Sequence, residues 1–165
     1  MEKKNLITSK LFTVILFLFG FMTVNINAQD MAVPANLQAA LFKKIFSFDK
    51  TLAAKGNVEV AVIGAGGDAV VSAFKDAGVN AKTATEIGGA SVVYIMPGTP
   101  SPKAQSASKG VLSISGVTSN VEEGKVAIGI GVEGGKPKII IHMAQLKAEG
   151  QELSADLLKI AKVIQ

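Results

Sequence analysis

The segment from Asn57 to Phe74 constrains the fold of this chain more than any other. It contains an apolar run at residues 57–63, a glycine-rich turn that starts at Gly64, and an amphipathic stretch that begins near Asp68. This order predicts a strand that leads through a tight turn into a helix. Strands that alternate with helices in this way are typical of α/β proteins with a parallel sheet. We therefore expect an α/β fold.

The rest of the chain extends the alternation. Residues 34–50 are predicted to form a first helix, whose apolar face contains Leu37, Leu41, Ile45 and Phe48 and is widened by Phe42 and Phe46. A helix is expected from Asp68 until Gly78 stops it. Further strands are expected at residues 79–83, 91–96, 111–114, 125–132 and 138–141, with helices at 143–149 and from Ser154 onward.

Residues 125–132 predict a strand with one very small face. Val126, Ile128, Ile130 and Val132 alternate with Ala127, Gly129 and Gly131. A face without bulky side chains lets another element approach closely. Residues 133–136 then predict a hairpin to the strand at 138–141, so an antiparallel pair is expected near the C-terminus.

The connection between the second and third strands is unusually short. About eight residues separate them, whereas a parallel crossover usually takes a dozen or more. The predicted class is nevertheless a single three-layer α/β domain. It is Rossmann-like, with a mixed, mostly parallel sheet, helices on both faces and a C-terminal antiparallel hairpin. In the last helix, Leu157, Ile160, Ala161 and Ile164 are expected to pack inward.

Residues 1–28 have the layout of a secretory signal peptide. A net positive start with Lys3, Lys4 and Lys10 precedes about fourteen mostly apolar residues, 11–24, and the small residue Ala28. The apolar run is shorter than the ~20 residues that a spanning helix needs. We expect cleavage after Ala28, which leaves a mature domain of residues 29–165 that is exported, periplasmic and not inserted in the membrane.

Composition excludes several classes of function. The chain has no cysteine, which excludes disulfides, thiol nucleophiles, thiolate metal sites and a lipoprotein anchor. Without Lys3, Lys4, Lys10 and Glu2, the totals of 17 basic and 13 acidic residues fall to 14 and 12. The lysines are scattered along the sequence and no arginine accompanies them. Nucleic-acid binding, which usually needs a basic patch, is not expected.

The turn at Gly64, Gly66 and Gly67 is the most suggestive motif. It follows a strand and opens a helix, as in dinucleotide-binding folds, and Glu86 stands about where an acid for the ribose would be expected. Backbone amides at such a turn can bind an anion. Export away from the cytosolic nicotinamide pool argues against a dinucleotide, and a tight turn needs glycine in any case. We keep the turn as a candidate anion or ligand site and expect no cofactor.

The remaining residues give little support for catalysis. The chain lacks a phosphate-binding P-loop and the Gly-x-Ser-x-Gly elbow of hydrolases. His142 is the single histidine, so a zinc site is not expected. It could act as a general base, although nothing marks its partners, or it could cap the end of a strand. We predict no catalytic or metal-binding residues and no enzymatic activity.

Residues 111–116, the glycine-bearing strands, residues 139–142 and residues 146–163 together resemble the YfiR family of exported bacterial proteins. Residues 41–48 also resemble the usual start of that family. His142 stands where the family usually has Asn, and Phe48-Asp49 replaces an aromatic-Pro pair that often follows the first helix. The cysteines that some members use for disulfides are absent, which rules out redox control of that kind here.

The resemblance implies a periplasmic regulator. YfiR-like proteins bind the periplasmic sensor region of an inner-membrane diguanylate cyclase and hold it inactive, which lowers cyclic-di-GMP and biofilm formation. It implies no catalytic residue, and it leaves the partner-binding residues unknown. A binding protein of this kind is expected to have an exposed apolar patch, and it could form a homodimer. Two alternatives stay open: a periplasmic small-ligand-binding protein, and a cell-envelope enzyme that uses His142.

Overall fold

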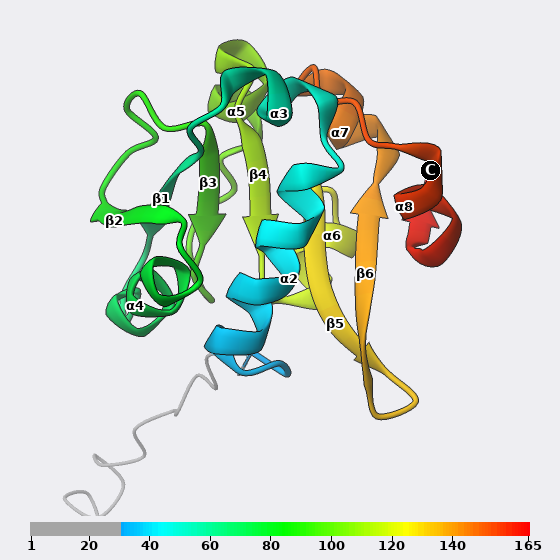
Figure 1. The fold of residues 1–165 in the computed structure, drawn as a ribbon, viewed down its shortest axis with the longest axis horizontal. Helices are drawn as coiled ribbons and strands as arrows, with labels where there is room; N and C mark the ends of the chain where they lie inside the picture. Colours follow the sequence, from blue (N-terminus) through cyan, green and yellow to red (C-terminus); the bar gives the residue numbers. More distant parts are fainter. Residues whose placement is uncertain (1–30) are drawn as a thin grey trace, which may run out of the picture.

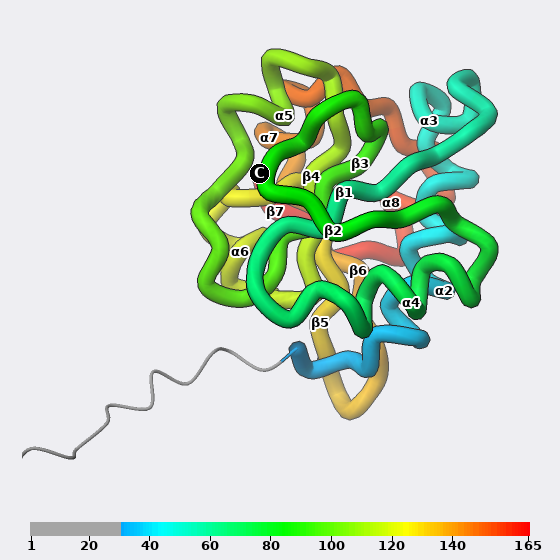
Figure 2. The backbone as a smooth tube through the Cα atoms, turned by 90° about the vertical axis from the view of Figure 1, so that its left-hand side faces the viewer, coloured from blue at the N-terminus to red at the C-terminus, as the bar shows by residue number. Residues whose placement is uncertain are grey.

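The part of the chain that the structure describes is built around a seven-stranded sheet. The computed structural model describes residues 31–165, so the predicted leader, residues 1–28, lies outside this range. The strand order is β2-β1-β3-β4-β5-β6-β7, and Figure 2 shows helices on both sides of the sheet. The predicted three-layer α/β class is confirmed. The strands are β1 (Glu59–Ile63), β2 (Asn80–Ala84), β3 (Val92–Ile95), β4 (Leu112–Ser115), β5 (Ile128–Glu133), β6 (Lys136–His142) and β7 (Lys162–Ile164).

The sheet is mostly parallel, as predicted. Every neighbouring pair from β2 to β5 is parallel, whereas β5 and β6 are antiparallel and β7 runs parallel to β6. Gly134 and Gly135 connect β5 to β6 with φ angles of 58° and 74°. Two successive positive φ angles are what a two-residue hairpin turn requires, and glycine adopts them without steric cost. The expected C-terminal hairpin is therefore confirmed (Figure 1).

The helices cover both faces of the sheet. Figure 2 places α2, α3, α4 and α8 on one side and α5, α6 and α7 on the other. Within residues 31–165, no helix combines the length and the apolar composition that a membrane span requires. The helices are α2 (Ala35–Ser47), α3 (Lys50–Lys55), α4 (Asp68–Asp76), α5 (Lys103–Lys109), α6 (Thr118–Glu122), α7 (Met143–Ala148) and α8 (Ala155–Ile160).

The first helix ends earlier than predicted, and a second short helix follows it. α2 ends at Ser47, and Asp49 begins α3 because its carboxylate Oδ1 accepts hydrogen bonds from the backbone N–H groups of Thr51 (2.8 Å) and Leu52 (3.2 Å). A side chain that satisfies these free donors starts a new helix at this point. The expected helix over residues 34–50 therefore ends about three residues early, and α3 was not predicted.

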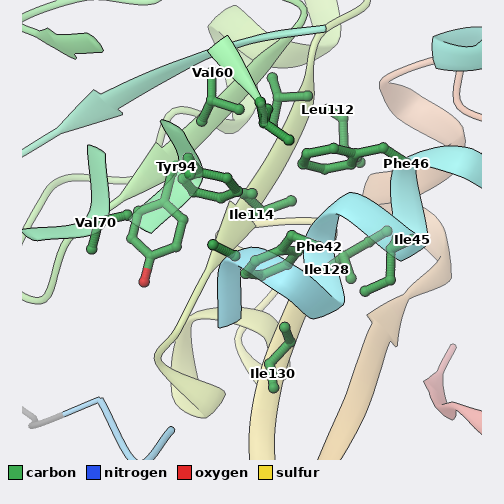
Figure 3. Packing of buried hydrophobic residues seen from close by; sticks show 14 of the residues in the cluster. Phe42, Ile45, Phe46, Val60, Val70, Tyr94, Leu112, Ile114, Ile128 and Ile130 are labelled. Atoms are coloured by element: carbon green, nitrogen blue, oxygen red, sulfur yellow. The ribbon is translucent and has the colours of Figure 1, made fainter. Parts of the chain in front are cut away.

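The main core lies between the sheet and α2, α3 and α4. Phe42 packs against Phe74 of α4 and Tyr94 of β3, with ring centroids 6.2 and 6.1 Å apart, and Figure 3 shows Phe42, Ile45 and Phe46 over the strands. The buried face of α2 is thus centred on Phe42 and Phe46. Leu37, expected on that face, is 41% exposed.

Residues 85–91 form the short connection between β2 and β3. Both strands are neighbours of β1, so this segment returns to the start of β3 by passing over one strand. Seven extended residues reach roughly 23 Å, which is enough for a return of about 16 Å and a sideways step of about 10 Å. Ile87 is buried against Val93 and Ile95. A short segment with a turn at Gly88 and Gly89 and no helix therefore covers this part of the second face. The sequence alone left the route of this connection unresolved.

The glycines of β5 face α6. This confirms the expectation that another element approaches the small face of this strand closely. A Cβ atom on Gly129 would overlap the Val121 side chain of α6 and lie 3.0 Å from the Ser115 carbonyl oxygen. A Cβ atom on Gly131 would lie 2.5 Å from Thr118 Oγ1. The helix approaches the strand closely because neither glycine has a side chain.

The C-terminal segment differs from its prediction. α8 ends at Ile160, and Lys162–Ile164 form β7 on the free edge of β6. Ala161 has extended backbone angles, φ −86° and ψ 155°, which end the helix. Leu157 is buried as expected, but Ile160 is 63% exposed. The helical spacing of these apolar residues indicated a longer helix. In the folded protein, Lys162–Ile164 instead pair with the backbone of β6, which local spacing cannot indicate.

Candidate functional site

The glycine turn at the end of β1 is closed by a neighbouring loop. Gly64 has φ 117°, and a Cβ atom there would overlap the hydroxyl group of Thr99 and lie 2.7 Å from the Met96 Cβ. Thr99 Oγ1 donates a hydrogen bond to the Ile63 carbonyl at 3.2 Å. In doubly wound folds, ligands usually enter a crevice at this point, between the carboxyl ends of two central strands. Here the segment that contains Met96 and Thr99 occupies that crevice.

The other glycines of the turn are arranged differently. A Cβ atom on Gly67 would lie 2.8 Å from Val62 Cγ1, so the helix start needs glycine for packing. Gly66 has φ 76° and faces open space. Glu86 is exposed in the connection after β2. Packing thus explains Gly64 and Gly67, and anion binding at this turn stays a prediction that depends on Gly66 alone.

His142 caps a helix. It is the last residue of β6 and the N-cap of α7, where its Nδ1 accepts a hydrogen bond from the Gln145 backbone N–H at 3.3 Å. Its ring lies against Gly124, where a Cβ atom would be 2.9 Å from Nε2. Among residues 31–165, no group of three or more His, Asp or Glu side chains is placed to hold a metal ion. The geometry gives His142 a structural role at the junction of β6 and α7.

Glu149 is a buried carboxylate that sequence reasoning did not identify. It follows α7 and is fully buried. Its Oε1 accepts hydrogen bonds from the Ser106 hydroxyl (2.7 Å), the Gln145 amide (2.8 Å) and the Ser113 hydroxyl, and its Oε2 accepts one from the Ser113 N–H (2.9 Å). Burial raises the pKa of Glu149, although these hydrogen bonds oppose the shift. The carboxylate joins α5, β4 and α7.

A second polar cluster lies at the carboxyl end of β3. The Tyr94 hydroxyl is 2.8 Å from Gln38 Oε1 and 2.8 Å from Met31 Sδ. Gln38 Nε2 donates a hydrogen bond to the Val33 carbonyl at 2.6 Å. A Cβ atom on Gly116 would lie 2.5 Å from Gln38 Nε2. These contacts hold the segment before α2 against the sheet. Burial raises the pKa of the Tyr94 hydroxyl.

Exposed apolar side chains gather at the end of the sheet that β7 forms. Ile160 is 63% exposed and Val163 is 37% exposed. β7 is the last strand in the order, so its outer backbone edge has no neighbouring strand within the described residues. We call Ile160, Val163 and this outer edge the β7 edge (at the right of Figure 1). Such an edge can pair with another chain, which makes it the candidate partner-binding surface.

The fold defines the protein as a doubly wound α/β domain, and comparison with known proteins then gives its family. The model of the YfiR/HmsC-like family, DUF4154, matches residues 36–162, and the chain belongs to that family. The suspected YfiR resemblance is confirmed. The family is periplasmic and regulatory rather than catalytic, and its members are known as regulators of diguanylate cyclases.

Two solved structures share the fold. One is the ABC domain in complex with L-Trp from Streptococcus pneumonia, with a TM-score of 0.55, 13% identity, and coverage of 79% of this chain and 62% of that chain. The other is a conserved domain protein from Vibrio cholerae O1 biovar El Tor, with a TM-score of 0.50, 13% identity, and coverage of 80% and 60%. The chain thus spans less than two thirds of either structure. No curated protein matches this chain.

Proposed function

We propose that the protein is a periplasmic regulator that binds the periplasmic sensor region of an inner-membrane diguanylate cyclase and represses it. The observation that carries this proposal is the family match over residues 36–162. The signal-peptide layout of residues 1–28 supports export to the compartment where such a sensor region lies. Within residues 31–165, no three His, Asp or Glu side chains are placed to hold a metal ion, which is compatible with a binding role.

The regulation would act through differential binding. A protein that binds the inactive state of its target more tightly than the active state shifts the population toward the inactive state. Moving such an equilibrium from about 1:99 to about 99:1 takes roughly a 10⁴-fold difference in affinity between the two states. No covalent step is needed, so the regulator requires a surface and no catalytic group.

The β7 edge is the surface that we assign to the partner. Its free backbone groups could accept an added strand, and Ile160 and Val163 could supply apolar contacts beside it. Lys159 and Lys162 are paired with Asp156 (3.1 Å) and Glu122 (3.0 Å). These ion pairs leave the apolar side chains as the distinctive feature of the edge. A second copy of the chain could use the same surface, which is where we place the possible homodimer.

The test compares cyclic-di-GMP in cells that lack the protein with cells that carry it. Deletion should raise cyclic-di-GMP, and the wild-type chain should restore the lower level. Ile160→Lys should fail to restore it, because a charge replaces an exposed apolar contact while the fold is little affected. Leu37→Lys is the matched control, since Leu37 is also exposed but lies on α2. Unchanged cyclic-di-GMP on deletion would contradict the proposed target.

The two alternative functions have weaker support. A ligand site at the glycine turn would have to form although Met96 and Thr99 fill the space next to Gly64. An enzyme that uses His142 would need a second reactive group nearby, whereas the hydrogen bond found there caps α7.

A further inference from the structure

A pocket of about 370 Å³ opens between α2, α3 and the turns that precede β1 and β2. Phe46, Leu52 and Val79, all nearly or fully buried, form its apolar part. Its polar part includes Lys43 and the exposed side chains of Asn57 and Asn80. The pocket lies beside the amino ends of β1 and β2, at the opposite end of β1 from the glycine turn, and no function described above uses it.

Lys43 is the single charged side chain in the lining, all of which belongs to the described part of the chain. Its Nζ donates a hydrogen bond to the Ala77 carbonyl at the end of α4, at 2.7 Å, which holds the ammonium group beside the pocket. An ammonium group has three donors, so two remain for a ligand. No carboxylate lines the pocket to compete for them.

The two asparagines add neutral polar groups. Asn80 Nδ2 donates a hydrogen bond to Asn57 Oδ1 at 2.9 Å. This contact leaves the second N–H of Asn80 and the amide N–H₂ of Asn57 as donors, with Asn80 Oδ1 as an acceptor. The pocket therefore combines an apolar part with an excess of hydrogen-bond donors and one positive charge.

We propose that this pocket binds a small organic monoanion, a carboxylate with a compact apolar body. Its volume lies near the lower end of the range for ligand sites, which limits the size of the ligand. A carboxylate would accept hydrogen bonds from Lys43, and the apolar body would contact Phe46, Leu52 and Val79. A zwitterionic amino acid would bind less well because its ammonium group would find no carboxylate in the lining. The inference does not depend on the proposed regulatory function.

The test is a calorimetric titration of residues 29–165 with three probes: phenylacetate, its neutral isostere phenylacetamide, and phenylalanine. Phenylacetate should bind saturably and at least about tenfold more tightly than the other two. Lys43→Gln should abolish that preference. Lys44→Gln, one residue further along α2 and outside the lining, should leave it unchanged.

Ala53→Leu provides a test that keeps Lys43 and its contact with Ala77. Ala53 is exposed on α3 and lines the pocket, so a larger side chain should fill the site and reduce phenylacetate affinity at least about tenfold. The proposal is overturned if phenylacetate shows no saturable binding below about 10 mM, if phenylacetamide or phenylalanine binds as tightly, or if Ala53→Leu leaves binding unchanged.

Discussion

At the scale of single residues, Glu149 is a carboxylate that the fold buries completely. Burying a carboxylate costs free energy unless hydrogen bonds compensate, and Ser106, Ser113 and Gln145 supply them. A signal for this cluster does exist in the sequence, because Ser113 interrupts an apolar strand and a buried hydroxyl needs a partner. The identity of the partner could not be predicted, since Glu149 lies 36 residues away along the chain.

Replacing Glu149 should make this role measurable. Glu149→Ala should lower the free energy of unfolding by roughly 3 kcal/mol or more, because several buried donors lose their acceptor. Glu149→Gln should cost less, because it keeps the shape and one acceptor. Urea unfolding measures both changes. A loss below about 0.5 kcal/mol for Glu149→Ala would contradict the assigned role.

The pH dependence of stability tests the same residue. Burial raises the folded-state pKa of Glu149 above its ordinary value of 4.5, so the folded state binds the proton more tightly than the unfolded state. The stability that this tighter proton binding contributes is fully present below the pKa of Glu149 in the unfolded state. It is lost as pH rises through the pKa of the folded state. The wild type should therefore lose stability relative to Glu149→Gln as pH rises through this window. Asp49, whose pKa is also raised by burial, is present in both proteins and cancels.

At the scale of elements, glycines and caps decide where helices lie. α6 packs against β5 only because Gly129 and Gly131 have no side chains. The small face of β5 was readable from the sequence, but the identity of the element that covers it was not. The break between α2 and α3 was missed, although Asp49 is a residue type that favours the N-cap position. Local hydrophobic spacing extended the first helix to residue 50, across this break, and did not indicate α3.

Gly129→Ala tests the contact between β5 and α6. The added methyl group would overlap the Val121 side chain, so the free energy of unfolding should fall by about 1–3 kcal/mol. Gly89→Ala is the matched control, because a Cβ atom there would meet nothing within 4 Å. Combining Gly129→Ala with Val121→Ala should recover part of the loss in a double-mutant cycle. Equal effects of Gly129→Ala and Gly89→Ala would contradict the close approach.

At the scale of the whole molecule, export is the prediction that the structure leaves to experiment. Residues 1–28 lie outside the described range, and the family is periplasmic. The protein recovered from the periplasmic fraction should begin at Gln29, which its intact mass and N-terminal sequence would show. Ala28→Arg should retain the leader, because a large charged residue does not fit the small-residue cleavage pattern. A periplasmic protein that still begins at Met1 would contradict cleavage.

The sequence by itself determined the α/β class, the strand–turn–helix unit from Asn57 to Phe74, the small face of β5 and the C-terminal hairpin. These features follow from local patterns: hydrophobic periodicity, glycine conformational freedom and turn chemistry. The tertiary structure decided the closed glycine turn, the route of residues 85–91, the partners of Glu149 and the strand pairing of Lys162–Ile164. Each of these depends on contacts between segments far apart in the chain, which no local pattern contains.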